Sequence, residues 1–420
     1  MTLQHQARLG SAIFLLVIFM LGADPVIVSG GPENDYESWI ARLTDDRLMI
    51  VFCRNPDWAS GDLYVTFSTD DGYTWETPAP IIVQSGDQAT LSFLQLPGDT
   101  LRLWYASNET GEYNIYSAYS LDGLAWILEG RTELGWQPQS RYYDPTVIME
   151  ADCSLTMSYR GPDGAYVAHA PYGSTWDTLR TQVAAGGYRP RIMKHPNGTY
   201  LYAYHRNIGG SQYEVHIRTS TDLTHWSTEI QLTSQGNSHD AFVNATPDDG
   251  YLIYYATYEY PAYNLFRRRS YNTIDWETEE QITQDAYWNT QPHFFIQSDN
   301  VYLIWAHATT SAGDTYDVYF ERTPYIFGIE ERQSSVSVIN TLYPVPCRDI
   351  LTVIPGAPDV QHMKVAVYDI LGNKIMQRIT CDASATQRMT VNTSTLTQGT
   401  YFVKIECDKG CYFEKFVVTR

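Results

Sequence analysis

Positive charge is scarce in this chain. Its 420 residues include 28 lysines and arginines against 48 aspartates and glutamates, which gives a net charge of −20 at pH 7. Nucleic acids and anionic membrane surfaces are bound mainly through clustered Lys and Arg, so we expect no nucleic-acid partner and no binding to such a membrane. The composition instead predicts an extracellular protein with a solvated acidic surface.

Long hydrophobic runs are also few. The single such run, residues 12–21, follows Arg8 and ends just before Ala23. It is short for a bilayer span of about 20 residues, but it has the length and the small-residue end of a secretory signal peptide. We therefore predict a signal peptide over residues 1–23 and no transmembrane segment after its removal.

Cysteine is sparse and shows no metal-binding spacing. The chain has six cysteines, and four of them (Cys347, Cys381, Cys407 and Cys411) lie near the C-terminus. Export permits disulfides among these four, whereas the spacing fits no zinc pattern. The histidines considered below, His205 and His307, also lack partners at metal-ligand spacing, so we expect no metal and no cofactor.

The most informative stretch is residues 68–75, Ser-Thr-Asp-Asp-Gly-Tyr-Thr-Trp, which follows an alternating, strand-like segment. Asp70 can accept hydrogen bonds from the backbone N–H groups of a tight turn, and Gly72 can take the positive φ that such a turn needs. Trp75 brings a large apolar surface that can pack beside the turn. By itself this predicts a hairpin turn.

The turn recurs. Related sequences occupy 120–126, 170–176, 220–226 and 270–276, and their tryptophans follow one another at intervals of 51, 50, 50 and 50 residues. A period of about 40–50 residues with several short strands per repeat indicates a β-propeller. The residues assigned to these structural turns are Ser68, Asp70, Gly72, Trp75, Asp122, Trp126, Trp176, Asp222, Trp226 and Trp276.

Three strand-like segments precede each turn, and a sixth set, beginning at residue 291, has no Ser/Trp turn. We predict an all-β fold, a six-bladed β-propeller with five blades as the alternative, followed by a small immunoglobulin-like β-sandwich. The expected divisions are signal peptide 1–23, propeller 24–327, linker 328–340 and sandwich 341–420. A strand from residues 24–36, or one near residues 325–327, is expected to close the ring.

Three ordered motifs mark the C-terminal segment. They are Tyr-Pro-Val-Pro at 343–346, Tyr-Asp-Ile-Leu-Gly at 368–372 and Leu-Thr-Gln-Gly-Thr-Tyr at 396–401. They resemble the C-terminal sorting domain of the type IX (Por) secretion system, although Val345 stands where that family has Asn. The resemblance implies type IX secretion machinery as a partner, and a location outside the cell or on the outer surface of a Gram-negative bacterium. A generic immunoglobulin-like adhesion or spacer module is the alternative.

The repeated turn matches the Asp-box, or bacterial-neuraminidase repeat, most fully at residues 68–75. Residues 36–325 accordingly resemble the sialidase-like propellers, although shortened boxes also occur in five-bladed glycosidase propellers. The box identifies a fold and says little about activity.

Propeller geometry separates scaffold from candidate site. In a four-stranded blade the first strand starts, and the second strand ends, at the top face, whereas the turn before the fourth strand lies at the bottom. The candidates therefore come from the strand-start residues, meaning the residue at the start of each first strand, and from the loops after the second strands. The strand-start residues are Glu37, Thr90 (a neutral member), Asp144, Arg189, Asp240 and Gln291. The loop candidates are Arg54, Arg160, His205, Arg206, Tyr258, Glu259 and His307.

The resemblance to sialidases implies three arginines that hold a carboxylate, a Tyr activated by a Glu, and an Asp acid/base. On that basis the catalytic candidates are Asp144, Asp240, Arg189, Tyr258 and Glu259. The ligand-binding candidates are Glu37, Arg54, Arg160, His205, Arg206, Gln291 and His307.

One departure speaks against sialidase chemistry. The family's Arg-Ile-Pro motif is missing from the first blade, which reads Glu-Ser-Trp-Ile at 37–40. A glycosidase using two carboxylates, Asp144 with Asp240 or Glu37, stays open. So does a purely structural role, in which these acids bond backbone N–H groups and the arginines pair between blades.

Two functions follow. In the first, an exported propeller binds a glycan, a surface polysaccharide or a protein at its central top-face pocket. In the second, the same pocket is the active site of a glycoside hydrolase, either a sialidase or a two-carboxylate glycosidase. The sequence favours binding slightly over catalysis.

Overall fold

The computed structural model describes residues 24–325 and 341–420, apart from 136–139, 173, 179, 211, 235, 299, 311–312, 314, 355–362, 370–373, 381–388 and 408–409. The expected signal peptide and linker lie outside the described residues. The chain divides into two compact units, Met1–Tyr325 and Ile326–Arg420. Across the described ranges, no helix is long and apolar enough to cross a membrane.

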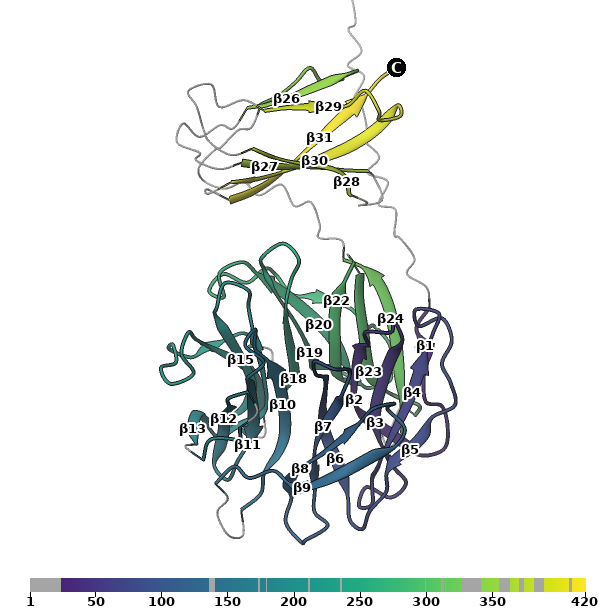
Figure 1. Cartoon of the computed structure of the whole chain (residues 1–420), viewed down its shortest axis with the longest axis vertical. Helices are drawn as coiled ribbons and strands as arrows, with labels where there is room; N and C mark the ends of the chain where they lie inside the picture. Colours follow the sequence, from purple (N-terminus) through teal and green to yellow (C-terminus); the bar gives the residue numbers. More distant parts are fainter. Residues whose placement is uncertain are drawn as a thin grey trace, which may run out of the picture. The chain divides into compact units, whose positions relative to one another are not determined.

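Four-stranded antiparallel sheets make up the first unit, and the described residues form six of them (Figure 1). Blades one to three are β2 (Asn34–Arg42), β3 (Leu48–Asn55), β4 (Asp62–Ser68) and β5 (Ala79–Ile82); β6 (Gln88–Gln95), β7 (Leu101–Ser107), β8 (Asn114–Ser120) and β9 (Trp126–Arg131); and β10 (Tyr143–Met149), β11 (Leu155–Arg160), β12 (Gly164–Ala170) and β13 (Thr181–Ala185). Blades four and five are β14 (Gly187–Lys194), β15 (Tyr200–Gly209), β16 (Gln212–Ser220) and β17 (Ile230–Gln231); and β18 (Ser238–Ala245), β19 (Tyr251–Glu259), β20 (Ala262–Ser270) and β21 (Glu280–Gln281). The sixth blade comprises β22 (Asn289–Gln297), β23 (Asn300–Ala308), β24 (Tyr316–Pro324) and β1 (Val26–Ile27).

The blades form a closed ring. The six first strands, β2, β6, β10, β14, β18 and β22, each contact the next, and β22 contacts β2. The N-terminal strand β1 pairs with β24, and the Val28 N–H donates to the Val318 carbonyl at 2.8 Å. Of the two closing strands expected, the one from residues 24–36 is therefore the one observed. It joins the segment that precedes the first blade to the sheet of the sixth blade.

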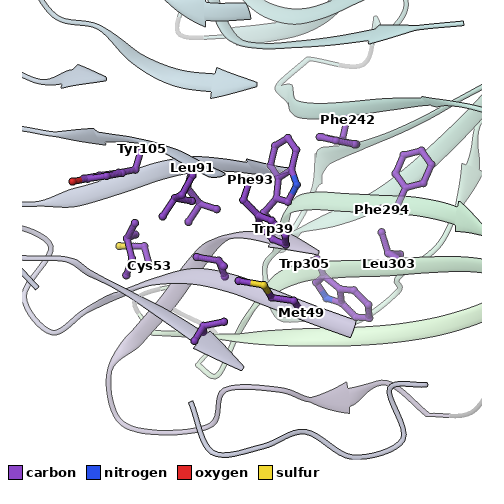
Figure 2. Close-up of a cluster of buried hydrophobic side chains, with 14 of the residues drawn as sticks. Trp39, Met49, Cys53, Leu91, Phe93, Tyr105, Phe242, Phe294, Leu303 and Trp305 are labelled. Carbon is purple, nitrogen blue, oxygen red and sulfur yellow. The ribbon is translucent and has the colours of Figure 1, made fainter. Parts of the chain in front are cut away.

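Apolar side chains from neighbouring sheets fill the space between blades. Figure 2 shows part of this core, in which Trp39 lies beside Phe242 with ring centroids 5.5 Å apart. The second strand β3 is almost wholly buried. A buried Leu or Phe side chain contributes roughly 1.5–3 kcal/mol by leaving water. This continuous hydrophobic packing holds the ring of first strands in place.

The repeated turns have the expected construction. In the first, Asp70 Oδ1 accepts hydrogen bonds from Ser68 Oγ and from the Thr74 N–H, both at 2.8 Å, and Gly72 has a φ of 90°. Trp75 lies edge-on to Phe320 of the sixth blade at 5.3 Å. This turn follows β4 at the edge where β2 ends, opposite the edge where β2 starts. The predicted separation of turns from strand-start residues is thus observed.

Gly72 tests how the first turn holds two blades together. A Cβ at Gly72 would come within 2.1 Å of the Phe320 ring, whereas one at Gly98, with a similar positive φ, meets nothing within 4 Å. We expect Gly98→Ala to cost about 1 kcal/mol of unfolding free energy from backbone strain alone, and Gly72→Ala at least about 2 kcal/mol more. Urea denaturation measures both, and equal losses would contradict this packing.

The second unit is a small β-sandwich, as predicted. One sheet contains β25 (Thr341–Tyr343), β26 (Ile350–Ile354) and β29 (Met389–Asn392). The other contains β28 (Lys374–Thr380), β27 (Met363–Tyr368), β30 (Gly399–Cys407) and β31 (Gly410–Val418). Leu351, Val367 and Phe416 are fully buried in its core. Cys347 is buried and forms no disulfide, and Cys381 lies outside the described residues.

Ring closure places two acids beside one arginine. Arg54 makes a bidentate pair with Asp35, at 2.8 and 2.7 Å, and Asp317 interacts electrostatically with both residues. Burial and the charge of Asp35 raise the pKa of Asp317 to about 6. Because Asp317 begins the part of β24 that pairs with the closing strand, its ionisation acts on ring closure.

Asp317 should make stability depend on pH. The folded state holds its proton more tightly than the unfolded chain, whose pKa is near 3.8. The ionisation therefore destabilises the fold progressively from about pH 4 to about pH 6, by up to roughly 3 kcal/mol. We expect Asp317→Asn to raise the thermal midpoint at pH 7.5 and to change it little at pH 4. The exposed Asp24→Asn is the control, and equal effects at both pH values would contradict the assignment.

Candidate functional site

Each first strand is interrupted near its start by a bulge. All six strand-start residues have positive φ, between 32° and 57°, and the strand register shifts at the same place in every blade. Non-glycine residues rarely adopt this conformation, and it persists where the surrounding structure requires it. The six strand-start residues are Glu37, Thr90, Asp144, Arg189, Asp240 and Gln291. Hydrogen bonds between blades show that these side chains meet at the ring's centre.

Arg189 lies at the middle of this group. It donates to both carboxylate oxygens of Glu37, at 2.9 and 2.5 Å, although Glu37 belongs to the first blade and Arg189 to the fourth. Its Nε lies 3.1 Å from Asp240 Oδ1. Gln291 completes the contact by accepting from the Glu37 N–H at 2.9 Å and donating to its carboxylate at 3.1 Å. One arginine thus links acids from opposite and adjacent blades.

Asp144 is the least satisfied acid of the group. Its side chain is buried, and its backbone N–H donates to Thr90 Oγ1 at 3.1 Å. Its Oδ2 has no hydrogen-bond partner among the described residues. Burial raises the pKa of the Asp144 carboxyl, and the charges of Arg189 and Arg191 offset only part of that effect. One oxygen of this carboxyl is therefore both shielded from solvent and without a hydrogen bond among the described residues.

Asp240 is in the opposite state. Burial opposes its ionisation, but Arg189 and His239 outweigh that cost and lower the pKa of its carboxyl. Its Oδ2 lies 2.9 Å from His239 Nδ1. Its backbone N–H donates to His205 Nδ1 at 3.3 Å, which requires that nitrogen to be unprotonated, and burial lowers the pKa of His205 to about 3. The pKa values of two neighbouring carboxyls are thus shifted in opposite directions.

A second layer of side chains lies beneath the strand-start residues, and the sequence analysis did not identify it. His293 is sandwiched between Trp39 and Phe242, with ring centroids 4.1 and 4.0 Å away. Arg191 donates to Thr146 Oγ1 at 3.0 Å, and burial lowers the pKa of Arg191. Each of these residues follows a strand-start residue by two positions. Strand alternation sends such pairs to the same side, and this was the signal that could have found them.

The two layers line a hollow with about 320 Å³ of empty space, part of it open to solvent. Glu37, Arg189, Asp240 and Gln291 form its upper lining. Arg160 lies beside the group. It interacts electrostatically with Asp144, donates to the Gly187 carbonyl at 3.0 Å, and lies over the Tyr188 ring at 4.2 Å. Most of the expected strand-start candidates therefore gather at one place.

Several loop candidates do not reach this hollow. Arg54 is paired with Asp35, and Arg206 donates to Glu229 at 2.5 Å. His307 lies 2.8 Å from Asn289 Oδ1 and stacks near Tyr319. Each bonds a neighbour in or near its own blade, and none of the three is among the residues that line the hollow.

The expected nucleophile pair is not formed either. Tyr258 lies against Tyr263 and is 37% exposed, while Glu259 accepts from Gln281 at 3.3 Å. Adjacent residues on a strand point to opposite faces, which explains why the two separate. The hollow's lining also contains two arginines, not three, and both are engaged with neighbouring side chains. The side-chain set implied by the sialidase resemblance is therefore not assembled here.

The second unit matches a known domain family. Residues 341–419 match the secretion system C-terminal sorting domain. The second unit is a type IX sorting domain. This domain directs proteins through the type IX machinery of Gram-negative bacteria, to the cell surface or the medium. No curated protein matches the chain.

The first unit is similar in fold to several solved propellers. A protein of unknown function from Dyadobacter fermentans is 13% identical, with a TM-score of 0.59 over 72% of this chain and 98% of that one. The GH93 α-L-arabinofuranosidase of Fusarium graminearum, solved with arabinobiose, is 15% identical, with a TM-score of 0.54 over 72% and 98%. The NanB sialidase from Streptococcus pneumoniae is 9% identical, with a TM-score of 0.55 over 72% and 70%. These likenesses establish a sialidase-like propeller fold.

Arg189 should be essential to the stability of the ring. Arg189→Met leaves Glu37 and Asp240 buried without their cation, so we expect a loss of about 3–5 kcal/mol in unfolding free energy. The loss should be larger at pH 8 than at pH 5. In the variant, the buried carboxyls without their arginine can take up protons at pH 5 but stay ionised at pH 8. Urea denaturation of the full chain measures it. Arg102→Met, which breaks the more exposed pair with Glu129, is the control and should cost under about 1 kcal/mol. Equal losses in the two variants would contradict the central role of Arg189.

Proposed function

We propose that the propeller binds a neutral glycan in its central hollow, and that the sorting domain delivers it to the outside of the cell. The observation that carries this proposal is the convergence of three carboxyls at the ring's centre, where Glu37 and Asp240 line the hollow and Asp144 interacts with both electrostatically. The three acids belong to three different blades, so the fold itself brings them together.

The chemistry of the hollow suits a sugar. Carboxylates accept hydrogen bonds from sugar hydroxyls, and the amide of Gln291 can both donate and accept. Trp39 and Phe242 lie beneath them, but both are buried with His293 between their rings, so the contacts with a sugar come from the polar groups above. The roughly 320 Å³ of space in the hollow includes open solvent, and the part enclosed by side chains holds about one water molecule. A sugar ring therefore binds at the open mouth of the hollow and not inside it.

The charges favour a neutral ligand over a sialic acid. Both arginines of the hollow already serve acids or a hydroxyl of the protein. Burial lowers the pKa values of His205 and His293, so neither adds positive charge at neutral pH. An anionic sugar would have to displace Glu37 from Arg189, and it would meet two further carboxyls nearby. The similar fold of an arabinobiose-binding α-L-arabinofuranosidase supports a neutral sugar by analogy.

Hydrolysis of a glycoside is the second candidate function. It is favoured by the raised pKa of Asp144 beside the lowered pKa of Asp240, because a two-carboxylate glycosidase needs one protonated and one ionised carboxyl. In that scheme Asp144 donates its proton to the leaving-group oxygen. Asp240 then either activates water or attacks the anomeric carbon.

One panel of saccharides tests both functions. Full-length protein is titrated calorimetrically with arabino-, xylo- and cello-oligosaccharides and with sialyllactose, and each mixture is then assayed for new reducing ends. We expect binding to a neutral saccharide, weakened at least tenfold by Gln291→Ala, because Gln291 lines the hollow, and unchanged by Asp222→Asn, a turn variant at the bottom face. Preference for sialyllactose, or binding that Gln291→Ala leaves intact, would contradict the proposal.

The reducing-end assay separates the two functions. Hydrolysis abolished by Asp144→Asn and by Asp240→Asn assigns catalysis to the hollow. Binding without hydrolysis by the unaltered protein excludes the hydrolase for that saccharide and leaves the binding function standing.

A further inference from the structure

We propose that Trp58, in the loop between β3 and β4, is a platform for a second sugar ring of an oligosaccharide whose first ring lies at the mouth of the central hollow. This inference rests on the proposed function and adds a subsite to it. It makes the ligand an oligosaccharide chain and not a single sugar.

Trp58 is an exposed aromatic side chain whose ring is already ordered. It is 53% exposed. Its ring stacks on Tyr36, with centroids 5.3 Å apart and planes inclined by 29°, and Tyr316 lies edge-on to it at 6.2 Å. A large, rigid aromatic surface supported from behind and open to solvent in front is the kind of surface that packs against the apolar face of a sugar ring.

The platform adjoins the hollow. The loop leaves β3 at the edge where β2 starts, since Asn34 pairs with Asn55 and Tyr36 with Cys53. Tyr36, which supports Trp58, is followed directly in sequence by Glu37, which lines the hollow. The platform and the hollow therefore lie at the same edge of the first blade.

Hydrogen bonds fix the conformation of the loop. Asp57 Oδ1 accepts from the Ala59 N–H at 3.0 Å and from Ser60 Oγ at 2.7 Å. Asn55 Oδ1 accepts from the Asp57 N–H at 3.1 Å. Trp58 itself has a φ of 63°, a conformation that a bulky residue adopts only when its surroundings hold it there.

A buried aspartate anchors both ends of the loop. Asp87 Oδ1 accepts from Asn55 Nδ2 at 3.0 Å and from the Gly61 N–H at 2.8 Å. Asp87 belongs to the segment that leads into the second blade, so the loop is tied to the neighbouring blade. Little conformational freedom is left for a ligand to remove, which favours binding.

The other strongly exposed aromatics near the blade turns differ in their surroundings. Tyr73, 62% exposed, is covered by the guanidinium of Arg322, 4.9 Å from its ring. Tyr172, 72% exposed, lies in the third turn, at the edge opposite the hollow. Tyr172 is therefore a matched control for Trp58, because it is an exposed aromatic that the proposal leaves without a role.

The test is the dependence of affinity on saccharide length. Full-length protein and its variants are titrated with arabino-, xylo- and cello-saccharides of one to five units. For the series that binds, we expect Trp58→Ala to lower affinity about tenfold for chains of two or more units, and to leave the single sugar within about twofold. Trp58→Phe should retain most of the affinity for the longer chains, and Tyr172→Ala should retain all of it.

The outcomes separate this inference from the proposed function. An equal effect of Trp58→Ala on all chain lengths, or no effect on any, overturns the subsite while leaving the hollow as the binding site. If the unaltered protein binds none of these saccharides, the proposed function fails and the subsite fails with it.

Discussion

The ion-pair network of Arg189 is the interaction on which the centre of the propeller depends. A ring of first strands necessarily brings one side chain from every blade to its middle, and here three of those side chains are carboxyls. Three buried acids without a cation would repel one another and lose their hydration. Arg189 reaches Glu37 across the ring and Asp240 beside it, so one guanidinium offsets that cost and links separate blades. The network does not extend to Asp144 Oδ2, which has no hydrogen-bond partner among the described residues.

The repeated turns and the strand-start residues lie at opposite edges of the blades. The turns lie at one edge, where Gly72, Trp75 and their counterparts pack one blade or strand on the next. The strand-start residues and the Trp58 loop lie at the other. The turns therefore place no constraint on which residues occupy the opposite edge. This agrees with sialidase and arabinofuranosidase structures sharing this fold at 9–15% identity to the chain. The sorting domain is a separate unit with its own core.

The sequence predicted the fold and the position of the strand-start residues because both depend on regular patterns. A period of about 50 residues sets the repeat, and antiparallel pairing sets which edge each segment reaches. Side-chain partnerships follow no such pattern. Glu37 and Arg189 are 152 positions apart, and nothing in the sequence pairs them. Arg54 and Arg206 belong to the expected loops, but nearby acids engage them first. Arg191 and His293 were missed because only the strand-start residue of each first strand was considered. Strand alternation places the residue two positions later on the same side.

The most direct test of the account is a crystal structure of the full-length protein with a bound neutral oligosaccharide. The account predicts one sugar ring at the mouth of the hollow, with a hydroxyl within hydrogen-bond distance of Asp240 or Gln291, the Glu37–Arg189 contact intact, and the next ring stacked on Trp58. A saccharide bound at another face of the propeller, or an anionic sugar that takes Arg189 from Glu37, would contradict it.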